Sequence, residues 1–149
     1  MIMPDALTGA VGQRPPVGTA CLPPGTLPAW IPRGAGLRVV RDVAGLGVDV
    51  VWLALPVGEE VLGELGARSG AVIEDRRPAA GMCWMVPAWT AGGMRLPLWE
   101  DASMGAALYV PGLEMRNERL RWRVRPDAGA LVTNPVTLRA AVIAVGDVQ

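Results

Sequence analysis

Proline is distributed so unevenly along this chain that it limits where regular structure can form. The first 36 residues hold seven of the 14 prolines and six of the 19 glycines. Proline removes a backbone donor and glycine loses the most conformational entropy on folding, so neither a regular helix nor a central strand fits this stretch. We therefore expect residues 1–36 to form an extended Pro/Gly-rich arm, either pinned to the body by burial of the Trp30 indole or poorly ordered. Residues 37–149 then form one domain.

The first half of the body shows a strand pattern followed by a helix pattern. The run 47–55 is β-branched and apolar, and it lies between glycine and proline, which is typical of a strand buried on both faces. The run 57–66 has apolar residues at helical spacing. Glu59 and Glu60 then fall in the first turn, where carboxylates interact favourably with the helix dipole.

Later apolar runs are short and are separated by turn residues, which predicts a sheet of short strands. A charged turn between the runs 71–74 and 81–86 makes these two strands antiparallel neighbours. The other expected elements are strands at 106–110 and 118–124 and a helix with Asn134 as N-cap and Pro135 at its first position. The fold class is therefore a small α+β (mixed α/β) domain, with about two helices and a mixed or largely antiparallel sheet.

The chain has no histidine and no lysine, and this excludes most familiar catalytic sites. Without histidine, neither a Ser-His-Asp triad nor a histidine-ligated zinc site can form within one chain. Cys21 and Cys83 lie far apart and form no metal-binding or disulfide pattern. Basic and acidic residues number 14 each, so the chain has no global attraction to nucleic acid or membrane. We expect a cytoplasmic protein with no cofactor, no catalytic residues and no membrane association.

Arginine alternates with apolar residues over 119–125, as in a strand with one charged face. Leu120, Trp122 and Val124 are expected on one face, with the arginines on the other. Such a row suits the phosphates of a nucleic acid or the carboxylates of an acidic partner. The alternative is a solvated strand face whose charges protect a sheet edge from aggregation. The candidate binding residues are Arg119, Arg121, Arg123 and Arg125.

Two tryptophans in expected loops, Trp89 and Trp99, are candidates for a protein-binding surface. They lie near several methionines, and thioethers repack easily while indoles give large contact areas. The alternative is that tryptophan and methionine replace the absent phenylalanine in the core. Together with the proline-rich arm, these residues also support a structural or assembly subunit that docks onto copies of itself or onto another chain.

Three carboxylates, Asp49, Glu74 and Asp75, are candidates for a metal site. Divalent magnesium prefers hard oxygen ligands, and two-metal phosphoryl transfer needs clustered acids. If the three residues converge, they support a metal-dependent enzyme of the nucleotidyl-transfer type. The alternative is a charged turn that interacts with itself and with water.

Short motifs along residues 47–145 carry a resemblance to a known family. They are the runs 67–75, 83–87, 96–97, 109–111, 121–124 and 131–135, with Leu138. In this order they resemble short actinobacterial relatives of the N-terminal domain of bifunctional DNA primase/polymerases. Active members of that superfamily carry paired acids for two divalent metals, a small-x-His motif for the nucleotide and a further acid.

This chain departs from the family pattern at its catalytic positions. Val51 stands where a second acid would follow Asp49, and the chain contains no histidine. The resemblance therefore implies a catalytically degenerate member that keeps the fold and a binding surface but does not polymerise. The leading hypothesis is a non-catalytic binding module that acts through protein contacts or weak nucleic-acid contacts.

Overall fold

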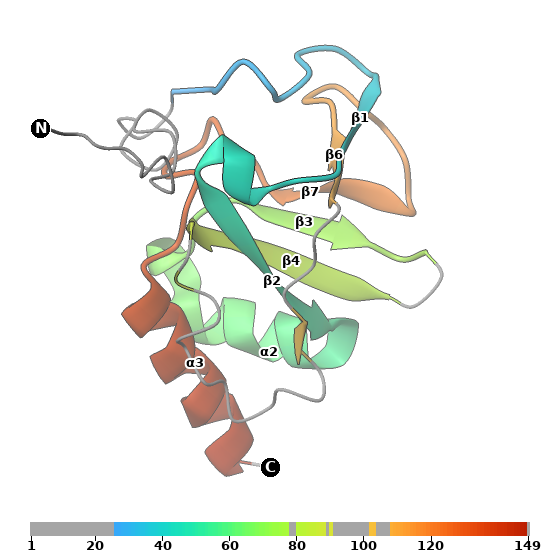
Figure 1. Ribbon diagram of the computed structural model, residues 1–149. Helices are drawn as coiled ribbons and strands as arrows, with labels where there is room; N and C mark the ends of the chain where they lie inside the picture. Colours follow the sequence, from blue (N-terminus) through green and yellow to red (C-terminus); the bar gives the residue numbers. More distant parts are fainter. Residues whose placement is uncertain (1–25, 78–79, 89, 91–101, 104–107, 149) are drawn as a thin grey trace, which may run out of the picture.

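The computed structural model describes residues 26–77, 80–88, 90, 102–103 and 108–148. These form an α+β domain with two antiparallel sheets and two α-helices, as the sequence predicted (Figure 1). The strands are β1 (Leu37–Val40), β2 (Val48–Ala54), β3 (Val72–Asp75), β4 (Gly81–Pro87), β5 (Ala102–Ser103), β6 (Leu108–Pro111) and β7 (Leu120–Val124). The helices are α2 (Leu55–Leu65) and α3 (Pro135–Val148), with short 3-10 turns at Ala44–Leu46 and Gly66–Arg68.

The larger sheet has the strand order β5-β2-β4-β3-β7, and every pair in it is antiparallel. The expected hairpin is confirmed, because β3 and β4 pair from Val72 opposite Trp84 to Asp75 opposite Gly81. A second sheet contains β1 and β6, which are also antiparallel. Both β3 and β4 are buried on both faces, so the sheet is the middle layer of the domain.

Helices α2 and α3 cover one face of the larger sheet, which we call the helix face (Figure 1). Alternate strand residues point to the same face, so every second apolar residue of β2 and β4 packs against the two helices. The buried residues of the core on the helix face include Val51, Leu53, Met82, Trp84, Val61 and Leu138. None of the helices in the described part of the chain is long and apolar enough to cross a membrane.

The opposite face, which we call the arm face, is covered by residues 26–36 together with the β1–β6 sheet (Figure 1). Residues 26–36 form turns and bends, as their proline and glycine content predicts. Trp30 and Ile31 are buried against this face, so the described part of the arm packs on the body. The Arg33 guanidinium donates to the carbonyls of Leu27, Pro28 and Ile31, which holds this irregular segment in shape.

The sequence predicted the start of helix α3 correctly and that of helix α2 wrongly. Helix α2 begins at Leu55, two residues before the predicted start, because Pro56 occupies its first turn, where the missing N–H removes no helical bond. Glu59 therefore lies beyond the first turn. Helix α3 begins as predicted, since the Asn134 side-chain oxygen accepts hydrogen bonds from the backbone N–H groups of Val136 and Thr137.

A β-bulge interrupts the alternation of β7 that the sequence predicts. Trp122 lies opposite Ile73, whereas Val124 lies opposite Val72, so Arg123 is an extra residue on β7. A bulge places two residues against one and redirects the side chains beyond it. Val124 consequently packs on the helix face, while Trp122 packs on the arm face. The prediction that these two side chains share a face was wrong.

Candidate arginine-rich binding surface on strands β3 and β7

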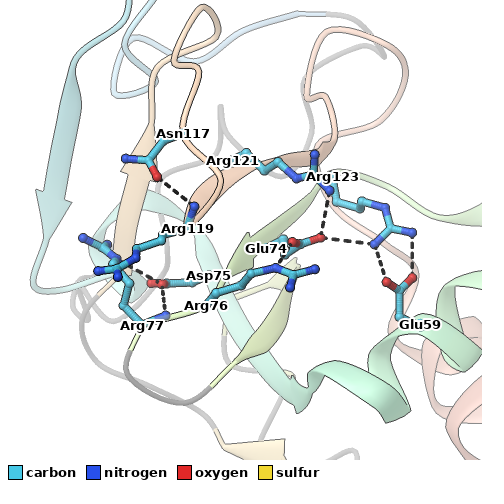
Figure 2. Close-up of polar contacts among 9 residues, drawn as sticks. All are labelled: Glu59, Glu74, Asp75, Arg76, Arg77, Asn117, Arg119, Arg121 and Arg123. Carbon is cyan, nitrogen blue, oxygen red and sulfur yellow. Dashed lines mark hydrogen bonds and ion pairs between the residues drawn. The ribbon is translucent and has the colours of Figure 1, made fainter.

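Glu74 is the centre of the arginine-rich region. Its side chain is 1% exposed, and it lies on the helix-face side of β3 directly opposite Arg121. Three guanidinium groups surround its carboxylate (Figure 2). The N···O distances are 2.7 Å to Arg76, 3.2 Å to Arg123 and 3.5 Å to Arg121. A carboxylate buried this deeply needs such partners, because an unpaired buried charge is strongly unfavourable.

The arginines also decide the protonation of Glu74. Burial raises the pKa of this carboxyl, but the hydrogen bond from Arg76 and the positive charges of Arg121 and Arg76 lower it by more. The net pKa therefore lies below the ordinary glutamate value of 4.5. Glu74 is an anion at neutral pH, and it neutralises part of the surrounding positive charge.

Arg123 joins β7 to helix α2. Its two terminal nitrogens bind the two carboxylate oxygens of Glu59 at 2.6 and 2.9 Å, and one of them also reaches Glu74 at 3.2 Å (Figure 2). The hydrogen bond from Arg123 lowers the pKa of Glu59, and the same bond raises the pKa of Arg123. Arg123 is therefore a bidentate structural link rather than a side chain available to a partner.

Arg125 lies apart from the other candidate arginines. It binds Asp127 through two hydrogen bonds of 3.0 and 2.9 Å and donates to the carbonyl of Leu113, which packs with the arm-face core. This follows from the bulge at Arg123, which shifts the alternation of the strand by one residue. The expected single row of four arginines is therefore wrong at its last position.

Arg119 and Arg121 are the members of the predicted row that remain exposed beside the Glu74 cluster. Arg119 lies next to Arg76, whose backbone N–H donates to the Arg119 carbonyl at 2.7 Å. The exposed side of these strands forms an open hollow, which we call the arginine hollow. Its lining residues are Glu74, Arg76, Arg77, Glu118, Arg119 and Arg121. Four arginines against two glutamates give this hollow a formal excess of two positive charges.

Asp75 points to the face opposite Glu74, because adjacent strand residues alternate. One of its carboxylate oxygens accepts from the Arg77 backbone N–H at 2.9 Å and from the Arg77 guanidinium at 3.2 Å. The same guanidinium lies 5.4 Å from the centre of the Tyr109 ring, within cation–π range. Arg77 therefore connects the arginine hollow to the β1–β6 sheet.

The three metal-ligand candidates do not converge. Asp49 lies opposite Val86 on β4, whereas Glu74 lies opposite Met82. At about 3.4 Å per residue, these two positions on β4 are about 13 Å apart. Glu74 and Asp75 also point to opposite faces of the sheet. Within the described residues, no group of three acidic, cysteine or histidine side chains is placed to hold a metal.

The two tryptophans predicted to bind a partner, Trp89 and Trp99, lie outside the described residues. A different apolar surface was missed. Leu37, Val39 and Tyr109 are 44%, 43% and 45% exposed, and Val39 lies directly opposite Tyr109 in the β1–β6 pairing. We call these three residues the apolar ribbon face. Its only signal in the sequence was the alternation of Leu37 and Val39, which is too short to distinguish a surface strand from a buried one.

Glu59 and Arg76 were also missed as parts of the site. Glu59 lies 64 residues before its partner Arg123 in the chain. Only the packing of α2 beside β7 brings the two together, so no local spacing could have revealed the pair.

No family model, curated protein or solved structure matches this chain. The resemblance to primase/polymerase domains therefore stays a prediction.

Proposed function

We propose that this domain is a non-catalytic binding module that holds an acidic protein partner in the arginine hollow. The observation that carries the proposal is the charge of this hollow. The chain as a whole is neutral, yet four arginines and two glutamates line one open surface. Carboxylates form strong charge-assisted hydrogen bonds with guanidinium groups, so acidic side chains are the matching ligands.

The reactive groups that the structure describes support a non-catalytic role. Burial raises the pKa of the Cys83 thiol far above its usual range, and the charge of Asp75 raises it further, so this thiol stays protonated. The Ser69 hydroxyl accepts a hydrogen bond from the buried Trp84 indole at 3.1 Å and donates to the Gly70 carbonyl. Both groups are thus used in packing.

An acidic protein suits the hollow better than a nucleic-acid backbone does. The two glutamates in its lining, Glu74 and Glu118, repel a continuous row of phosphates but leave room for separate carboxylates beside the arginines. Arg123 and Arg125, which a longer phosphate row would need, are already held by Glu59 and Asp127. The family resemblance makes nucleic acid the competing ligand, so the experiment includes it.

Binding of a fluorescent polyglutamate peptide tests this proposal, measured by anisotropy at low and high salt beside single- and double-stranded DNA. We expect the peptide to bind at low salt, to weaken with salt, and to bind about tenfold more weakly to an Arg119→Ala/Arg121→Ala variant. The matched control is Arg125→Ala, which removes an arginine outside the hollow and should bind as the wild type does. Tighter binding of DNA than of peptide, or no binding of peptide at low salt, would contradict the proposal.

A further inference from the structure

We infer that the apolar ribbon face extends the arginine hollow into one composite docking surface, which takes an acidic protein segment carrying apolar anchor residues. This inference rests on the proposed function and names the chemistry of the partner more closely. Three observations support it. The ribbon face is exposed, its residues Val39 and Tyr109 are cross-strand partners, and Arg77 connects it to the hollow.

The apolar ribbon face is exposed although the other side of β6 is buried. Leu108 and Val110 on β6 are 1% and 0% exposed, whereas Tyr109 between them is 45% exposed. Scattered single apolar residues are ordinary on a protein surface, but a contiguous group marks an interaction site more often. Here Val39 and Tyr109 are cross-strand partners, and Leu37 lies two residues along on the same face.

Arg77 makes the ribbon face and the hollow continuous. It lines the hollow, and its guanidinium lies over the Tyr109 ring. A segment that places carboxylates on Arg76, Arg119 and Arg121 therefore has an apolar surface within reach at one end of the hollow. Apolar anchors supply affinity that charge alone does not, since exposed ion pairs contribute little in water.

The charge of the hollow selects the occupant. A second copy of the chain has no net charge to offer. A purely apolar partner would cover the exposed guanidinium groups of Arg76, Arg119 and Arg121 without adding negative charge to that of Glu74, which Arg76 and Arg121 share. An acidic segment with interspersed leucine or aromatic residues matches both halves of the surface. A second hollow adjoins the first at Arg121 and includes Leu113, Met115 and Trp122, but these side chains are partly buried and so offer less apolar area.

Two synthetic peptides of equal charge test the inference. One alternates glutamate with leucine and tyrosine, and the other has serine in place of each apolar residue. We expect the wild-type protein to bind the anchored peptide about tenfold more tightly than the serine peptide. A Leu37→Ser/Val39→Thr variant should bind the two peptides equally. The matched control is Val136→Thr, which changes an apolar residue that is 76% exposed on helix α3 and should keep the tenfold preference.

The outcomes separate this inference from the proposed function. Equal binding of both peptides to the wild-type protein would overturn the inference and leave the acidic-partner function intact. A preference that survives in the Leu37→Ser/Val39→Thr variant would place the apolar contact elsewhere, such as in the hollow beside Trp122, and would also overturn it. Failure of both peptides to bind would overturn the proposed function as well.

Discussion

The two faces of the larger sheet are covered in different ways. On the helix face, α2 and α3 present apolar residues at regular helical spacing, and these pack against alternate residues of the strands. On the arm face, residues 26–36 have no regular structure and are held by individual contacts. Examples are the burial of Trp30 and the three carbonyl bonds of Arg33.

This difference shows where the domain depends on single positions. A regular helix distributes its packing over many side chains, so the loss of one contact removes only a small part of the packing energy. An irregular segment has no such periodic backbone bonds, so its path is fixed where backbone touches backbone. The backbone contacts of the arm are therefore expected to be more sensitive to substitution than the packing of the helices. For the adjacent acids of β3, the free energy lost on substitution is expected to follow the number of arginine partners, which is three for Glu74 and one for Asp75.

The largest effect is expected from Gly112→Ala. An added Cβ at Gly112 would overlap the carbonyl oxygen of Gly34 and lie 2.8 Å from that of Gly36, which also accepts the Gly112 N–H at 2.7 Å. Neither backbone atom can move without displacing the arm. We expect a loss of about 3 kcal/mol in the free energy of unfolding, measured by urea denaturation.

The matched control for this variant is Gly63→Ala on the exposed side of helix α2. An added Cβ there meets no atom within 4 Å. Alanine is the better helix former, so we expect a gain of about 0.5–1 kcal/mol. Equal effects of the two variants would show that the loss at Gly112 does not come from the contact with the arm.

An intermediate effect is expected from Glu74→Gln, which removes the negative charge shared by three arginines on the helix-face side of β3. Hydrogen bonds to charged groups contribute about 1.5–3 kcal/mol each, but these arginines are partly exposed, so we expect a total loss of about 2 kcal/mol at pH 7.

The same variant has a defined pH dependence. Because the pKa of Glu74 is lower in the folded protein than its ordinary value of 4.5, its ionised form stabilises the fold above that pH. This contribution is lost as the pH falls through 4.5 and then through the lower folded value. The difference between wild type and Glu74→Gln in urea titrations should therefore be constant near neutrality and shrink in acid. A difference that grew in acid would contradict this account.

The smallest effect is expected from Asp75→Asn, on the arm-face side of the same strand. Asp75 bonds only to the neighbouring Arg77 among the hydrogen bonds the structure gives it, and an asparagine oxygen can still accept from the Arg77 backbone N–H. We expect a loss of about 0.5–1 kcal/mol. A cost equal to that of Glu74→Gln would mean that the two adjacent acids are supported equally, despite their different surroundings.

The sequence was sufficient to predict the parts of the fold that depend on local patterns. The antiparallel pairing of β3 with β4, the α+β class and the Asn134 cap were predicted correctly, because each depends on residues close together in the chain. The predicted start of α2 was wrong because a proline can end a strand or begin a helix, and the local pattern does not distinguish the two.

The candidate site was predictable only in part. The alternation of arginine on β7 identified Arg119 and Arg121, which lie at the hollow. The roles of Arg123 and Arg125 were not predictable, because the first depends on Glu59 in a distant helix and the second on a bulge. Nothing in the spacing of the arginines distinguishes a strand with an extra residue from a regular one, since the bulge arises from pairing with β3.

The bulge at Arg123 acts as a phase shift within a single strand. Before it, arginine side chains lie toward the helices and the hollow; after it, Val124 takes that side and Arg125 turns to the other. Deleting Arg123 would remove the bulge and restore strict alternation, and Val124 would stay on the helix face and Arg125 on the other. The bulge therefore adds one arginine that reaches Glu59 on α2, and the residues after it keep the sides that pairing with β3 gives them.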